Sequence, residues 1–220
     1  MHRTIIQALK KTAANMRSRT TEDYWENRYA KDGDSGSGSY GEHAEFKAEI
    51  INNFVLTNRI NSVIEFGCGD GNQLSLAKYP LYTGVDVSQT VLNRCRVKFS
   101  GDPTKTFLHS SEYNGQTAEC ALSLDVLYHL VEDEIFEDYM QCLFSAASRF
   151  VVIYSSDVKP DELKVRNFEM GKHVRHRYIT GYITQHYSEW KLVERIPNRY
   201  PYNWQTGEGS FSEFFVYSRG

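Results

Sequence analysis

The sequence has few cysteines, no long apolar run and no strong excess of either charge. Its four cysteines are widely spaced and form no CxxC pair, which argues against a disulfide framework and against a zinc site. No apolar run reaches the roughly 18 residues that a transmembrane helix requires. The apolar stretch after Met1 is interrupted by Lys10 and Lys11, so we also expect no secretory signal. These absences predict a cytoplasmic protein whose thiols stay reduced.

The charge balance bears on the class of partner. A formal net charge of -3 gives no global field that would attract nucleic acid, and the sequence lacks a basic groove with interleaved aromatic residues, so we expect no nucleic-acid partner. Residues 1–20 stand apart, because they carry lysines and arginines but no acidic residue, with apolar residues at helical spacing. Such a helix could dock weakly on an anionic membrane or a partner protein, or pack against its own domain.

Apolar runs alternate with helical patterns from residue 62 onward. The predicted strands are 62–66, 82–87, 105–109, 120–124 and 150–155, and the helices between them are 72–78, 88–97 and 132–147. A helix at 179–186 precedes two last strands at 190–196 and 213–218, which we expect to be antiparallel neighbours because no helical pattern separates them. Strands that are apolar on both faces and alternate with helices predict a mostly parallel α/β sheet with helices on both faces.

The N-terminal part has a different character. Two predicted helices, 21–30 and 42–57, flank a glycine- and serine-rich stretch at 33–41 that favours neither helix nor strand. Such a stretch could close over a ligand as a lid, or it could be a simple linker. We therefore predict a single domain of 220 residues, with 1–41 as a helical cap and lid segment and 42–220 as the ligand-binding α/β unit.

The most informative segment follows the first predicted strand, where Glu65 precedes glycines at 67, 69 and 71. Glycines here let a ligand approach the backbone, but Asn72 replaces the third glycine of the dinucleotide pattern GxGxxG. The Glu65 carboxylate disfavours a pyrophosphate and suits an ammonium group. Asp86, at the end of the next strand, can accept both hydroxyls of a ribose, a feature shared with nicotinamide-dependent enzymes.

Three segments resemble the first, second and fourth motifs of the class I S-adenosylmethionine-dependent methyltransferase family. They are Glu65-x-Gly67-x-Gly69-x-Gly71, Gly84-Val85-Asp86-Val87-Ser88 and Leu124-Asp125-Val126-Leu127-Tyr128-His129-Leu130, and the resemblance spans roughly residues 40 to 155. It implies a Rossmann-like methyltransferase fold with a seven-stranded sheet, an antiparallel last strand and extra N-terminal helices. The implied cofactor is S-adenosyl-L-methionine, with S-adenosyl-L-homocysteine as product.

The resemblance also implies which residues bind this cofactor. Asp125 would lie near the methyl group, while an Asp that many relatives carry after the third strand is replaced here by His109-Ser110-Ser111. The implied cofactor contacts are Glu65, Gly67, Cys68, Gly69, Gly71 and Asn72 for the methionine part, Asp86 for the ribose, Val87, Ser110 and Ser111 around the adenine, and Asp125. Tyr40 of the predicted lid segment is a further expected cofactor contact.

Residues after the fourth strand are the candidates for catalysis. His129 suits a general base at neutral pH, with Tyr128 and Asp125 as neighbours, although a histidine at this place could equally cap the next helix. The only other acid of note, Asp157, adds too little for a magnesium site, so we expect transfer without a metal.

Acceptor contacts are predicted from two further segments. The run 172–177 is rich in basic residues that could grip a carboxylate or phosphate, or instead form ion pairs with nearby acids. The predicted acceptor-binding residues are His173, Arg175, His176 and Arg177 from this run, with Tyr24 and Arg28 from the N-terminal helix.

The absence of an Asn/Asp-Pro-Pro-Tyr/Phe motif weighs against methylation of an amino group of adenine or glutamine. The sequence thus predicts methyl transfer to an oxygen of a small molecule or glycan precursor, including anionic or phosphorylated acceptors. Two alternatives remain open at this point: a non-catalytic cofactor-binding partner of another biosynthetic enzyme, and an NAD-binding oxidoreductase.

Overall fold

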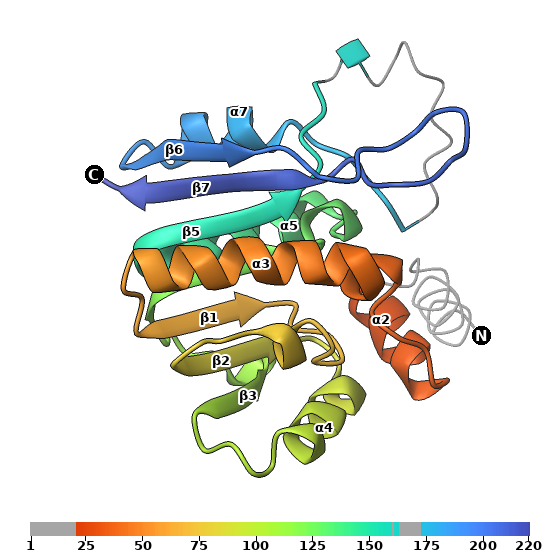
Figure 1. Ribbon diagram of the computed structural model, residues 1–220, viewed down its shortest axis with the longest axis vertical. Coiled ribbons are helices and arrows are strands. Elements are labelled where there is room, and N and C mark those ends of the chain that lie inside the picture. The colour runs from red at the N-terminus through yellow and green to blue at the C-terminus, as the bar shows by residue number, and fades with distance from the viewer. Residues whose placement is uncertain (1–20, 160, 163–172) are drawn as a thin grey trace, which may run out of the picture.

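A computed structural model describes residues 21–159, 161–162 and 173–220 of the chain. Its centre is a seven-stranded sheet in the order β3-β2-β1-β4-β5-β7-β6 (Figure 1). The strands are β1 (Ser62–Phe66), β2 (Leu81–Asp86), β3 (Lys105–His109), β4 (Ala118–Leu124), β5 (Ala147–Ser155), β6 (Trp190–Ile196) and β7 (Glu213–Arg219). β1 to β5 pair in parallel, and β7 runs antiparallel to both β5 and β6. The predicted α/β fold, with its antiparallel last strand, is confirmed.

Helices cover both faces of this sheet. The helices are α2 (Thr21–Ala30), α3 (Gly41–Thr57), α4 (Gln89–Lys98), α5 (Asp133–Ala146) and α7 (Ile179–His186). In Figure 1, α3 crosses in front of the sheet and α5 lies behind it. α2 lies at the end of the sheet where the parallel strands finish, and the loop between β6 and β7 extends beyond the same end (Figure 1). Ligands of open α/β sheets bind at this end, so the fold places the candidate site there.

Two apolar cores follow from the alternation of side chains along each strand. In β1, Val63 joins the core under α3 and α4, whereas its neighbour Ile64 joins the core under α5 and α7. In β5, Val152 and Ile153 divide in the same way. Successive strand residues point to opposite faces, so a strand that is apolar throughout must be covered on both sides.

One predicted element is wrong. The helix expected at 72–78 is only a single 3-10 turn, Leu74–Leu76, after which Ala77 is extended with ψ 148°. Pro80 restricts the residue before it to extended conformations, which leaves too little chain for a helix before β2 begins. The Ser75 hydroxyl also donates to the carbonyl of Asn72 at 2.5 Å, a local bond typical of turns.

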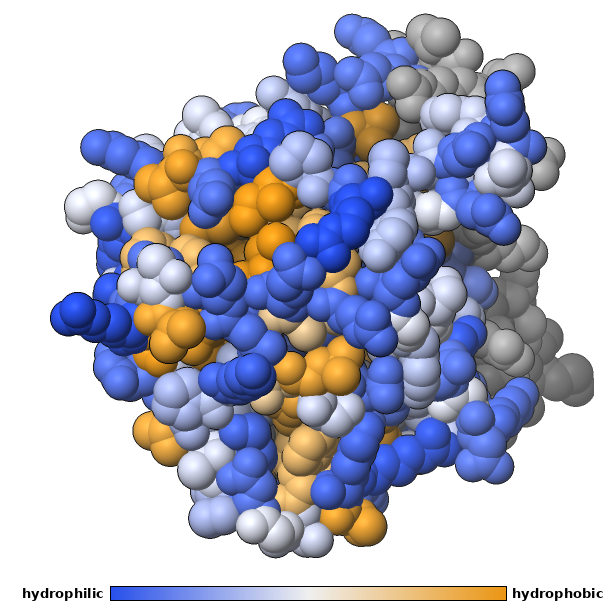
Figure 2. Space-filling view, viewed as in Figure 1, coloured by the Kyte–Doolittle hydropathy of each residue, from blue (hydrophilic) through white to orange (hydrophobic). Residues whose placement is uncertain are grey.

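The remaining elements agree with the prediction apart from their ends. The helix at 179–186 and the strand at 105–109 have the predicted bounds. The 33–41 stretch contains the 3-10 turn Ser37–Ser39 and ends at Gly41, the first residue of α3. The predicted helix in 1–20 lies outside the described residues. Within the described part of the chain no helix is both long enough and apolar enough to cross a membrane. On the face seen in Figure 2, exposed apolar side chains form patches separated by hydrophilic ones.

Candidate active site

The glycine loop after β1 has backbone conformations that require glycine. Gly67 and Gly69 have φ of 77° and 58°, in the left-handed region where a Cβ is strained. A Cβ on Gly69 would also lie 2.4 Å from the hydroxyl of Ser35. The loop is fixed on the sheet because the amides of Gly67 and Cys68 both donate to the carbonyl of Val85, at 2.7 and 3.2 Å. Its backbone therefore lies at the ends of β1 and β2.

Two buried carboxylates flank this loop. Glu65 at the end of β1 is only 4% exposed and accepts a hydrogen bond of 2.7 Å from the hydroxyl of Tyr82. Burial raises the pKa of Glu65 to about 7, against the opposing effects of the Tyr82 hydrogen bond and of the Lys47 charge. Asp86 accepts from the amides of Gly69 and Ser88 at 2.9 and 3.0 Å. Burial raises the pKa of Asp86 as well, and these amide bonds oppose it.

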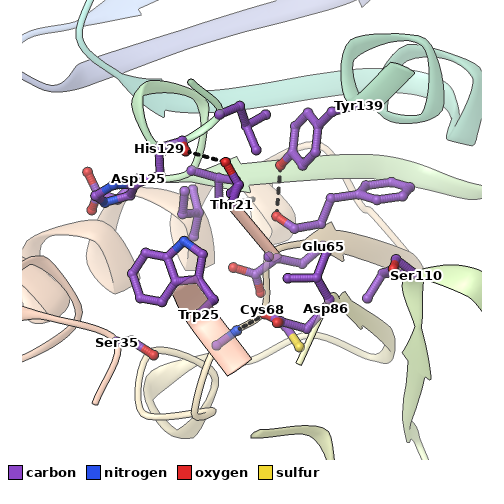
Figure 3. Close-up of a pocket in the computed structure, with 18 of the residues that line it drawn as sticks. Thr21, Trp25, Ser35, Glu65, Cys68, Asp86, Ser110, Asp125, His129 and Tyr139 are labelled. Carbon is purple, nitrogen blue, oxygen red and sulfur yellow. Dashed lines mark hydrogen bonds between the residues drawn. The ribbon is translucent and has the colours of Figure 1, made fainter. Parts of the chain in front are cut away.

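A cavity of about 340 Å³ lies at these strand ends. Figure 3 shows Glu65, Cys68 and Asp86 on the strand side, with Trp25 of α2 and Asp125 also around the cavity. Of the residues predicted to bind the cofactor, those that line it are Glu65, Gly67, Cys68, Gly69, Asp86, Val87, Ser110 and Asp125. Among the described residues that line it, the charged side chains are six carboxylates and a single cation: Glu22, Glu65, Asp70, Asp86, Asp125, Asp138 and Lys47.

Four predicted cofactor residues do not line this cavity; Gly71 is one of them. Tyr40 donates to Asp70 at 2.8 Å, and the side-chain amide of Asn72 donates to the carbonyl of Ser39 at 2.7 Å. Ser111 is hydrogen-bonded to the ring of His109 at 2.7 Å. These residues support the loops around the cavity.

The N-terminal segment is folded against the glycine loop. The Ser35 amide donates to Asp70 at 2.8 Å, and the Ser35 hydroxyl accepts from the Asp70 amide at 2.9 Å. On α2, Glu26 accepts from the hydroxyls of Ser88 and Thr90, which ties the helix to the start of α4. Thr21, Glu22, Trp25 and Tyr29 of α2 then line the cavity. The sequence identified this segment as a cap and lid, but its role stays a prediction.

Asp125 sits at the end of β4 with a φ of 59°, a left-handed conformation that is uncommon outside glycine. Its Oδ2 accepts from Lys47 Nζ at 2.6 Å, and its Oδ1 accepts from the hydroxyls of Tyr128 and Ser212 at 2.9 and 3.1 Å. The Lys47 side chain is only 1% exposed. Lys47 was not among the residues predicted from the sequence, although its position one helical turn before the buried Ile51 indicates that it faces the sheet.

His129 follows Asp125 in a 3-10 turn, Leu127–His129, and lines the same cavity. Its Nδ1 is 3.0 Å from the carbonyl oxygen of His173, which can only accept, so Nδ1 carries the proton and Nε2 keeps its lone pair. Burial lowers the pKa of His129 below its usual 6.5. The Trp25 ring meets it edge-on at 5.1 Å. A neutral imidazole with an available lone pair has the properties of a general base.

A second cavity of about 270 Å³ opens on the other side of Asp125. Asp125 lines both cavities. Tyr128 and His176, two of the predicted residues, also line the second one. The centroid of the Tyr128 ring is 4.5 Å from that of His129 and 6.1 Å from that of His176. Burial lowers the pKa of His176, whose Nδ1 is 2.7 Å from the hydroxyl of Ser156.

The basic run contributes to the site less directly than its sequence suggests. Arg175 and Arg177 both pair with Asp133, at 2.8 and 3.2 Å, and each also donates to a backbone carbonyl before α5. Neither lines either cavity. The His173 ring stacks on Tyr24 with centroids 3.9 Å apart. Lys172 lies outside the described residues.

Arg28, the remaining predicted acceptor residue, is also held away from both cavities. Its guanidinium donates to the carbonyl and carboxylate of Asp34, at 2.6 and 2.9 Å. Within the described ranges, no group of three or more His, Cys, Asp or Glu side chains is arranged to hold a metal ion.

Comparison with known proteins bears on the fold. No protein-family model and no curated protein matches the chain. The N-methyltransferase NodS from Bradyrhizobium japonicum WM9, solved with S-adenosyl-L-homocysteine, has a TM-score of 0.68 at 14% identity, covering 91% of this chain and 98% of that one. Magnesium protoporphyrin IX methyltransferase from Synechocystis PCC 6803, also with this product, gives 0.63 at 16% identity over 91% and 98%.

An S-adenosylmethionine-dependent methyltransferase from Clostridium acetobutylicum ATCC 824 gives a TM-score of 0.62 at 12% identity, covering 88% of this chain and 98% of that one. This chain matches nearly the whole length of each of these three structures. This chain therefore has the Rossmann-like fold of class I S-adenosylmethionine-dependent methyltransferases.

Proposed function

We propose that this chain is a methyltransferase that uses S-adenosyl-L-methionine. The observation that carries the proposal is the buried Glu65 carboxylate beside the glycine loop, in a cavity whose described charged side chains are acidic apart from Lys47. S-adenosyl-L-methionine brings a sulfonium and an ammonium group, both of which gain from such surroundings. A pyrophosphate would meet six carboxylates there, which weighs against NAD.

The described residues fit this cofactor from end to end. Glu65 would hold the ammonium group, and Asp86 still has lone pairs for the ribose hydroxyls after accepting two amide hydrogen bonds. Ser110 and Val87 also line the cavity and would lie against the adenine. NodS and the magnesium protoporphyrin IX methyltransferase, which share this fold, were both solved with S-adenosyl-L-homocysteine.

We further propose that the methyl group goes to an oxygen of a small molecule or glycan precursor. The bound cofactor supplies an electrophilic methyl group on a cationic sulfur. The chain must then align the acceptor and remove the hydroxyl proton, and His129, neutral with Nε2 available, is the proposed base. Asp125, held by Lys47 and two hydroxyls, would position the reacting groups where the two cavities meet.

Titration calorimetry with S-adenosyl-L-methionine, S-adenosyl-L-homocysteine and NAD tests the cofactor. We expect both sulfur compounds to bind with micromolar dissociation constants and NAD not to bind. Glu65→Gln should weaken binding at least tenfold, whereas Glu45→Gln, an exposed carboxylate on α3 that lines neither cavity, should not. Binding of NAD alone would refute the proposal.

A non-catalytic partner module would bind the cofactor equally well, so turnover needs its own assay. Release of S-adenosyl-L-homocysteine during incubation with candidate acceptors measures it. If the cofactor binds but no small molecule of any class is methylated, the result favours a non-catalytic partner module. A pull-down with the full chain and with a variant that lacks residues 1–20 then tests whether this segment binds a partner.

A further inference from the structure

The second cavity is lined by segments that are far apart in the sequence. Ser37 and Gly38 come from the glycine-rich stretch before α3, and Ser212 comes from the loop before β7. Both segments close directly on Asp125. A Cβ on Gly38 would lie 3.0 Å from Asp125 Oδ2, and the Ser212 hydroxyl donates to Oδ1. An acceptor in this cavity would therefore lie against Asp125, which also lines the proposed cofactor cavity.

The β6–β7 loop forms an ordered wall of this cavity. Backbone bonds of 3.0 Å run from the Tyr202 amide to the Ser210 carbonyl and from the Ser210 amide to the Tyr200 carbonyl, as in a small hairpin. Across this hairpin the rings of Tyr202 and Phe211 stack with centroids 4.1 Å apart. Both rings line the cavity. Stacked aromatic rings held by backbone hydrogen bonds present a rigid apolar platform.

The polar groups of the cavity are hydroxyls and histidines. Four serines, at positions 37, 156, 210 and 212, and the phenols of Tyr128, Tyr154 and Tyr202 contribute to its lining. Among the described residues that line it there is no lysine or arginine. The one carboxylate, Asp125, is already paired with Lys47. The two arginines that flank the cavity residue His176 in the sequence, Arg175 and Arg177, are paired with Asp133.

These surroundings discriminate against an anionic acceptor. Burial of a phosphate or carboxylate without a cation costs several kcal/mol, because the lost hydration is not replaced. Hydroxyl groups can be satisfied by other hydroxyls and by imidazoles, which donate and accept. An aromatic platform adds contact with the C–H face of a ring.

We propose that the second cavity is the acceptor site and that it takes a neutral, hydroxylated ring of about the size of one monosaccharide. The inference rests on the proposed methyl transfer. A ring hydroxyl oxygen forms the new bond to the methyl carbon as the methyl–sulfur bond breaks, and the electron pair of that bond stays on sulfur. The hydroxyl proton passes to His129, the proposed base, which lines the first cavity together with Asp125. The phosphorylated acceptors expected from the basic run are thereby disfavoured.

Turnover with matched probes tests the charge of the acceptor. Purified full-length protein is incubated with S-adenosyl-L-methionine and a panel of hexoses, each beside its 6-phosphate and its uronic acid, and S-adenosyl-L-homocysteine release is measured. We expect the neutral member of an accepted pair to have at least a tenfold higher kcat/KM than either anionic member. Ser37→Lys should narrow this gap and Ser37→Gln should not, because Ser37 is exposed and lines the cavity.

A second pair of variants tests whether the acceptor binds in the second cavity. Phe211→Leu keeps an apolar side chain but removes the stacked ring, and should raise the KM of the neutral probe at least fivefold while S-adenosyl-L-homocysteine binding stays unchanged. Tyr182→Leu is the matched control, since Tyr182 is also half-buried and lines neither cavity. Preference for the anionic probes, or turnover of none of the neutral ones while S-adenosyl-L-homocysteine binds, overturns the inference. Failure of S-adenosyl-L-homocysteine to bind instead refutes the proposed function itself.

Discussion

Affinity for S-adenosyl-L-homocysteine should depend on pH through the ionisation of Glu65. Burial raises the pKa of this carboxyl to about 7 in the free protein. The ammonium group of the ligand binds the ionised form, so binding must lower the pKa of Glu65 and release a proton. Affinity is therefore expected to rise with pH until Glu65 is ionised in the free protein as well.

The size of the effect follows from the ionised fraction. With a pKa of about 7, roughly a tenth of the Glu65 carboxyls are ionised at about pH 6 and about half at pH 7. If the carboxyl is ionised throughout this range in the complex, affinity rises about fivefold between these two pH values, which corresponds to about 1 kcal/mol. Binding at about pH 7 should release about half a proton.

Calorimetry in two buffers that differ in ionisation enthalpy measures both the affinity and the protons released. Glu65→Gln should bind more weakly and lose most of the pH dependence, which separates Glu65 from other groups that titrate nearby. Equal affinity of the wild type at both pH values, or the same pH dependence in Glu65→Gln, would refute the assignment of Glu65 to the ammonium group.

Further predictions concern stability and rate. Lys47→Met should lower the free energy of unfolding by about 3–5 kcal/mol in denaturant titrations, because it leaves the Asp125 carboxylate without its buried partner. Adding Asp125→Asn to this variant should recover part of the loss. If the effects of the two substitutions on the free energy of unfolding are fully additive, Lys47 and Asp125 do not interact as proposed. Gly69→Ala should weaken S-adenosyl-L-homocysteine binding at least tenfold, since its φ of 58° and the nearby Ser35 leave no room for a Cβ. His129 acts as a base only when neutral, so kcat should fall as pH drops through its pKa, which lies below 6.5; His129→Gln should lower kcat about a hundredfold or more and abolish that limb, whereas a near-normal rate would make His129 structural.

Much of the fold of this chain can be predicted from local sequence patterns. The runs that became β1 and β5 are apolar on both faces, and helical patterns separate them, so both the strands and their parallel pairing could be predicted. The failed helix at 72–78 shows the limit of such patterns. Its apolar spacing is compatible with a helix, but Pro80 and the short distance to β2 decide the outcome.

The meeting of three carboxylates in the first cavity was predictable for a topological reason. Glu65, Asp86 and Asp125 end three strands that neighbour one another in the sheet, so their carboxylates must meet at one edge. Lys47 was not predictable in the same way. Its partner is 78 positions away, and their meeting depends on how α3 crosses the sheet.

The basic run shows why exposed patterns are harder to interpret than buried ones. Side-chain alternation in an extended segment places Arg175 and Arg177 on one face and His176 on the other. The sequence predicted acceptor contacts from both faces, from Arg175 and Arg177 as well as from His176. In the structure the arginine face meets Asp133 and the carbonyls before α5, and the His176 face lines the second cavity. The alternation of side chains correctly separated the two faces of this segment. The position of α5 determines which of the two faces lines the second cavity.

The contacts of Asp125 also limit what it can do chemically. Three donors occupy its two oxygens, and one of them is the buried ammonium of Lys47. These contacts leave few lone pairs of the carboxylate open to a hydroxyl group of an acceptor. The proton of an acceptor hydroxyl is therefore better taken by His129, the proposed base. Asp125 instead fixes α3, β4 and the β6–β7 loop around the point where the two cavities meet, so its contribution to the proposed reaction is alignment.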